Sequence, residues 1–171
     1  MKHLNFRHTV KTIYLANITG ATVNNFSPLL FLTFQRQFGI SIGKISFLIT
    51  LNFGIQMLVD FLGAKFGDRL GYRRGAVFSQ LVAAAGLIGL GILPFLLPAY
   101  PALLLCTVLC AIGSGLNEVL LSPMLEALPG DAKASAMGIM HSFYCWGHVA
   151  VILISTLYFQ LAGIANWRWL A

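Results

Sequence analysis

Residues 63–74 read Gly63-Ala-Lys-Phe-Gly67-Asp68-Arg69-Leu-Gly71-Tyr-Arg73-Arg74 and connect two long apolar segments. Gly71 permits a tight reversal of the chain because glycine adopts a positive φ at little steric cost. Asp68 can cap the turn that follows or face the N-terminus of a neighbouring helix. The arginines can pair with carboxylates and stay at the polar surface of a bilayer. The segment therefore predicts a short basic loop between two apolar helices.

The composition around this loop is that of an integral membrane protein. Of the 171 residues, 58% are hydrophobic and 9% are charged, and the mean hydropathy is +0.82. Soluble domains carry about 25% charged residues, so a water-soluble globule of this size could not bury so much apolar surface. The net charge is +6, but the basic residues flank apolar runs, so we expect a lipid bilayer and no nucleic acid as partner.

Five apolar segments are long enough to cross about 30 Å of hydrocarbon, which takes about 20 helical residues. They are expected at about 11–35, 44–66, 74–97, 101–126 and 135–161. A sixth span is expected to begin at about residue 166, where Trp167 and Trp169 are typical of anchors at the membrane interface. The expected fold class is an all-α membrane protein with five complete transmembrane helices and the start of a sixth.

Lysine and arginine in the connecting segments predict the orientation. Most of them lie on the side that holds the N-terminus and the 63–74 loop. We therefore expect a cytoplasmic N-terminus, in the plasma (inner) membrane. Because a natural protein rarely ends at the threshold of a span, the chain is expected to be a fragment or a truncated product.

The 63–74 loop resembles the signature between the second and third helices of the major facilitator superfamily, approximately G-x-x-x-D-R-x-G-R-R. The resemblance is carried by Asp68, Arg69, Gly71, Arg73 and Arg74. Two departures are visible: Ala64 stands where the leading glycine is usual, with Gly63 adjacent, and Tyr72 moves the basic pair along by one residue.

This resemblance covers the whole chain and implies a secondary transporter that works by alternating access. The family has two six-helix halves, and the chain resembles most of the first half. The motif then implies a lock on the cytoplasmic side, with Asp68 meeting the missing C-terminal half or a second copy. Glu126, at the cytoplasmic end of the fourth span, is our hypothesis for a partner of Arg69 or Arg73.

Ionisable groups inside a bilayer are costly and are therefore candidates for function. Glu118 follows Asn117 inside the fourth span, and a lone carboxylate at that depth should be protonated or paired. It is suited to binding substrate or proton, and a hydrogen bond between helices is the alternative. In the fifth span, His141 and His148 share one helical face with Cys145. Either histidine could exchange protons with Glu118 or donate to a sugar hydroxyl, or could serve packing alone.

The first two spans carry neutral amides. Asn24 and Asn25 precede Pro28, which should bend the first span. Amides offer both donors and acceptors, which suits a ligand rich in hydroxyl groups. In the second span, Asn52, Gln56 and Asp60 are each four residues apart and form a polar stripe.

The resemblance implies that helices 1 and 4 line the central cavity, which makes Asn24, Asn25, Asn117 and Glu118 the expected cavity residues. The run from Asn24 to Leu30, Glu118 and the segment 134–147 are similar to the fucose-permease-like branch of sugar–proton symporters. That branch typically has a carboxylate on helix 1, where this chain has amides.

The expected function is secondary active transport of a small polar solute such as a sugar, with proton coupling. A multidrug or metabolite efflux carrier is one alternative, and a non-transporting membrane scaffold or truncated remnant is another. We expect no enzyme, no metal and no cofactor, because the sequence has no glycine-rich phosphate loop, nucleophile elbow or metal-ligand cluster.

Overall fold

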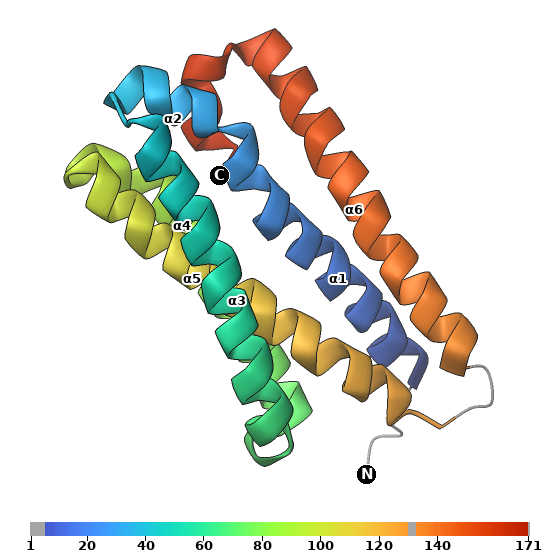
Figure 1. The fold of residues 1–171 in the computed structure, drawn as a ribbon. Coiled ribbons are helices and arrows are strands. Elements are labelled where there is room, and N and C mark those ends of the chain that lie inside the picture. Colours follow the sequence, from blue (N-terminus) through green and yellow to red (C-terminus); the bar gives the residue numbers. More distant parts are fainter. Residues whose placement is uncertain (1–5, 130–132, 171) are drawn as a thin grey trace.

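The computed structural model describes residues 6–129 and 133–170, without the side chains of residues 66–70. All regular elements in these ranges are helical: α1 (Phe6–Leu29), α2 (Phe31–Phe38), α3 (Ile42–Leu70), α4 (Tyr72–Leu96), α5 (Ala99–Glu126), α6 (Lys133–Ala162) and a 3-10 helix, η1 (Ile164–Trp169) (Figure 1). Within this part of the chain, α3, α4, α5 and α6 are long and apolar enough to cross a membrane. The expected all-α class is confirmed, but five complete spans and the start of a sixth are more than these helices show.

The expected first span, 11–35, is two helices. α1 begins earlier, at Phe6, and ends next to Pro28, and α2 follows at an angle to it (Figure 1). Proline has no backbone N–H to donate and its ring crowds the preceding turn, so it bends a helix. At the break, the Leu30 N–H donates to the Ser27 carbonyl at 3.0 Å. Asparagines and threonines lower the hydropathy of α1, which is therefore not among the four apolar helices.

α5 is the central helix of the bundle. It contacts α1, α3 and α4, while α1 and α6 pack along each other (Figure 1). Small residues allow the closest approach: a Cβ added at Gly113 of α5 would lie 2.8 Å from the Ala83 Cα of α4. Between helices in lipid, such close packing replaces the hydrophobic driving force that water supplies elsewhere.

Gly71 separates α3 from α4 with φ +74°. An L side chain rarely adopts that conformation. The tight reversal expected from the sequence at this residue is thus confirmed.

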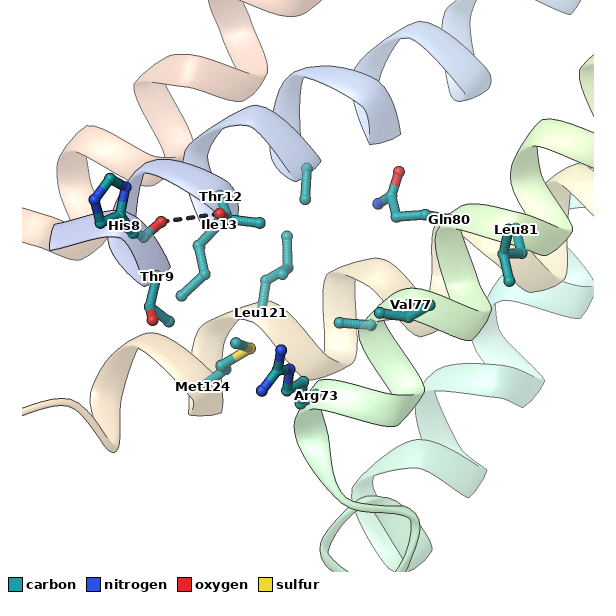
Figure 2. Close-up of a pocket in the computed structure, with 12 residues that line it drawn as sticks. His8, Thr9, Thr12, Ile13, Arg73, Val77, Gln80, Leu81, Leu121 and Met124 are labelled. Carbon is teal, nitrogen blue, oxygen red and sulfur yellow. Dashed lines mark hydrogen bonds between the residues drawn. The ribbon is translucent and has the colours of Figure 1, made fainter. Parts of the chain in front are cut away.

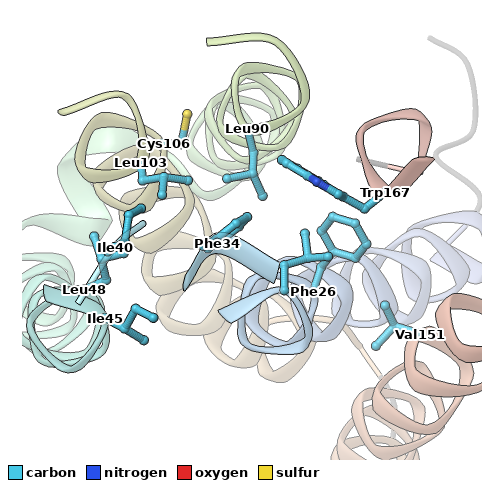
Figure 3. Packing of buried hydrophobic residues seen from close by; sticks show 11 residues of the cluster. Phe26, Phe34, Ile40, Ile45, Leu48, Leu90, Leu103, Cys106, Val151 and Trp167 are labelled. Carbon is cyan, nitrogen blue, oxygen red and sulfur yellow. The ribbon is translucent and has the colours of Figure 1, made fainter. Parts of the chain in front are cut away.

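The largest apolar cluster closes the end of the bundle near α2 (Figure 3). Trp167 of η1 is completely buried in it, with its ring 5.4 Å from Phe34 and its Nε1 donating to Gln37 Oε1 at 2.8 Å. The expectation that Trp167 anchors the membrane interface is therefore wrong, because the chain reverses at Gly163, packs η1 against α4 and α6, and points Trp167 at α2. Trp169 is 73% exposed.

The outer faces of the long helices remain apolar and exposed. Examples are Phe53, Met57 and Phe61 on α3, Phe78 and Leu81 on α4, and Leu153 and Leu157 on α6. Apolar surface of this extent is uncommon on water-soluble monomers and marks a protein that contacts lipid or a partner.

Candidate functional site

A group of polar side chains joins four helices. Gln56 of α3 donates from Nε2 to Asn24 Oδ1 of α1 at 2.8 Å and to Ser114 Oγ of α5 at 3.1 Å. Asn24 donates from Nδ2 to the Tyr144 hydroxyl of α6 at 3.3 Å. We call Asn24, Gln56, Ser114 and Tyr144 the central polar layer. Because hydrocarbon offers no water to polar groups, bonds between helices satisfy them.

Asn117 is 3% exposed, and its amide is used inside the bundle. Its Nδ2 donates to the Ala16 carbonyl of α1 at 3.0 Å, and its Oδ1 accepts from Gln80 Nε2 of α4 at 2.7 Å. Gly20 makes room for it, since a Cβ there would lie 2.7 Å from Asn117 Nδ2. Among the expected cavity residues, Asn117 thus joins α5 to α1 and α4, whereas Asn24 joins α1 to α3 and α6.

The other expected amide, Asn25, donates from Nδ2 to the Ala21 carbonyl of its own helix at 2.7 Å. Asn24 instead borders a crevice of about 60 Å³ between α1, α3 and α5. Asn52 of the polar stripe and Thr107 also line this crevice. The structure therefore places Asn24, and not Asn25, where the crevice meets the central polar layer.

Glu118 is exposed, although it follows the buried Asn117 on α5. It is within electrostatic reach of His141 on α6 and of Asp60 on α3. His148 is half-buried and lies about two turns farther along α6 than His141. The structure thus brings together Glu118, His141 and Asp60, the last of which the sequence assigned only to a polar stripe.

A larger pocket, of about 560 Å³, lies between α1, α4 and α5 (Figure 2). Ile13, Val77 and Leu121 give it apolar walls, while His8 and Arg73 are at its end near the start of α1 and α4 (Figure 2). None of the residues that we expect to bind solute or protons lines this pocket. Thr9, Thr12 and Gln80 also line it, but most of its surface is apolar, so we place the candidate site at the central polar layer.

The loop motif surrounds the junction of α3 and α4. Gly63 is buried against α5, where an added Cβ would lie 2.5 Å from Val119 Cγ1. Arg73, Arg74 and Glu126 are exposed where α4 begins and α5 ends. The side chains of Asp68 and Arg69 lie outside the described residues. The pairing of Glu126 with one of the arginines stays a prediction.

A comparison with families of known proteins decides the class of the chain. The family model of the Major Facilitator Superfamily matches residues 13–171. The chain belongs to the major facilitator superfamily. No individual curated protein and no solved structure gives a significant match.

Membership of the major facilitator superfamily confirms the family expected from the 63–74 loop. Together with the four apolar helices, it shows an integral membrane protein of a transporter family. Among the described residues, no group of three or more His, Cys, Asp and Glu could hold a metal ion.

Two members of the central polar layer of this superfamily protein were missed by sequence reasoning. Ser114 and Tyr144 lie in apolar runs and carry no spacing signal of their own. Gln80, which bonds Asn117, was also missed. Two signals pointed to the layer: Asn24 among the amides of the first span, and the four-residue repeat of Asn52, Gln56 and Asp60.

Proposed function

We propose that this chain forms the first half of a proton-coupled transporter that carries a small, hydroxyl-rich solute such as a sugar by alternating access. The observation that carries the proposal is the central polar layer with Glu118 beside it. The layer presents amide and hydroxyl groups, which both donate and accept hydrogen bonds. Glu118 supplies an exposed carboxylate at a depth where ionisable groups are rare unless they function.

The similarity of the 24–30 and 134–147 segments to fucose-permease-like symporters supports a sugar as the solute. The proposal includes α1 as a fifth membrane-crossing helix, with the N-terminus cytoplasmic and the protein in the plasma membrane. A C-terminal half or a second copy of the chain would complete the cavity.

The test is uptake by membrane vesicles that contain the protein, with a panel of labelled sugars and an imposed proton gradient. We expect Glu118→Gln to lower the stimulation of uptake by the gradient at least about fivefold, since couplings of 5–150-fold are typical. Glu118→Asp is the matched control, because it keeps an exposed carboxylate at the same position of the helix.

An unchanged response to the gradient in Glu118→Gln would remove this residue from the coupling. Extrusion of lipophilic cations, with no uptake of any sugar, would replace the sugar assignment by efflux. No movement of either class of solute would favour a membrane scaffold.

A further inference from the structure

α3 and α5 cross at close distance and run in the same direction. A Cβ added at Gly115 of α5 would lie 3.1 Å from Val59 Cγ1 and 3.4 Å from the Gln56 Cα of α3. One turn farther along both helices, a Cβ at Gly63 would lie 2.5 Å from Val119 Cγ1. Residues 56–63 of α3 therefore lie against residues 114–119 of α5.

This register sets Asp60 opposite Glu118. Gln56 and Ser114 are joined across the crossing by a hydrogen bond of 3.1 Å. Residues four apart lie above one another on a helix face, and Asp60 and Glu118 each follow one member of that bonded pair by four residues. The two carboxylates consequently occupy the next turn, and Asp60 is within electrostatic reach of Glu118.

Asp60 has an unsatisfied atom. Its Oδ1 is buried and has no hydrogen-bond partner within the described part of the chain. A buried polar atom that lacks a partner is costly, and more so when the group is charged. A proton bound between two facing carboxyl groups would provide the missing bond, since the protonated group donates its O–H to the other.

The remaining elements around α5 contribute few titratable groups at this depth. α6 brings His141, three residues before Tyr144 of the central polar layer. α1 and α4 bring the neutral amides of Asn17 and Gln80. The titratable groups near the start of α1 and α4 are Arg7, His8, Lys11, Arg73 and Arg74, and Lys65 follows Asp60 by five residues on α3.

We propose that Asp60 is the second carboxylate of the proton site and that Asp60 and Glu118 together hold one proton. The inference rests on the proposed function, in which Glu118 takes part in coupling. Two carboxylates that share a site do not both ionise without cost. One proton therefore binds to a carboxylate oxygen and is shared as an O–H···O bond, and its release leaves the pair with both charges, with His141 of α6 within electrostatic reach of Glu118.

The experiment is an infrared pH titration of the carboxyl bands of the whole protein in lipid, with no solute and no gradient. Groups that interact by more than about one pK unit titrate in two joint steps. For the pair of Asp60 and Glu118, we expect two separated protonation steps in the wild type. In Asp60→Asn, the Glu118 step should move by at least about one pH unit, whereas Glu126→Gln should leave both steps in place.

Coupling between two sites is reciprocal, so Glu118→Gln must move the Asp60 step by the same amount. This second variant tests the proposal if Asp60→Asn does not fold. Equal titration of Glu118 in wild type and Asp60→Asn, or of Asp60 in wild type and Glu118→Gln, would overturn the carboxylate pair. Because no transport is measured, a coupled pair in a protein that moves no solute would refute the proposed function alone.

Discussion

At the scale of single residues, the polar side chains of the interior fall into two groups. The amide of Asn117 is used completely by neighbouring helices, and Gln80 and the Ala16 carbonyl are its partners. Asn24 also bonds neighbouring helices through both amide atoms, but it borders a crevice, and Glu118 is exposed. Residue type alone does not separate these groups, because an amide that joins helices and an amide that binds a solute have the same chemistry.

Asn117→Ala should lower the free energy of unfolding by about 1–3 kcal/mol, the cost of leaving buried polar partners unsatisfied. The measurement is denaturant unfolding of the protein in detergent micelles. Asn25→Ala is the matched control, since the Asn25 amide bonds only its own helix, and it should cost about 1 kcal/mol or less. Equal losses in the two variants would contradict the role given to Asn117.

At the scale of the helices, contact between α4 and α5 depends on small residues on both sides. A Cβ added at Gly113 would lie 2.6 Å from the Ala83 backbone nitrogen and 2.8 Å from the Ala83 Cα. These backbone atoms are about as near as the Ala83 Cβ, at 2.7 Å. The neighbouring Gly86 is similar, since an added Cβ would lie 2.9 Å from the Cys110 backbone nitrogen. Backbone atoms cannot rotate away as a flexible side chain can, so the helices themselves would have to separate.

Gly113→Ala should therefore destabilise the bundle by about 1–3 kcal/mol through overpacking. Gly138→Ala on α6 is the control, because no atom lies within 4 Å of a Cβ at that residue. It should be neutral, or stabilising by up to about 1 kcal/mol, through its higher helix propensity. Thermal unfolding of the two variants side by side checks the difference, and a Gly113→Ala protein as stable as the control would disprove the close contact.

At the scale of the whole molecule, the proposed orientation in the membrane can be tested at the ends of two parallel helices. α3 begins after Ser41 and α5 ends before Ala127, and the two helices run in parallel. Their opposite ends therefore belong to opposite sides of the membrane. The basic residues of the 63–74 loop favour the cytoplasm for the side that holds Ala127.

In a background with Cys145 replaced by serine, Ser41→Cys should react with a membrane-impermeant maleimide added to intact cells. Ala127→Cys should react only after permeabilisation, because it is on the proposed cytoplasmic side. Arg7→Cys should behave in the same way, because the proposed α1 span begins on the cytoplasmic side. Cys106 and Cys110 are buried and should stay unlabelled. Labelling of Arg7→Cys in intact cells would show that α1 does not cross the membrane.

Several properties of this protein could be predicted from its sequence alone. The apolar composition, the basic charge of residues 63–74 and the reversal at Gly71 are local features, because hydropathy, charge and backbone preference are properties of short segments. The loop expected over 63–74 is wrong in extent, because α3 continues to Leu70 and α4 begins at Tyr72, which leaves Gly71 alone between them. The local features were enough to predict a helical membrane protein of the major facilitator superfamily. The bend at Pro28 was predictable for the same reason.

Only the tertiary structure decided which distant side chains meet. Trp167 has the sequence context of an interface anchor, yet it is buried because η1 turns back and points it at α2. The bond between Asn117 and Gln80, and the facing positions of Asp60 and Glu118, depend on how α5 crosses α3 and α4. A helix places its residues on faces, but the register between two helices is set by the packing of small residues far apart in the chain.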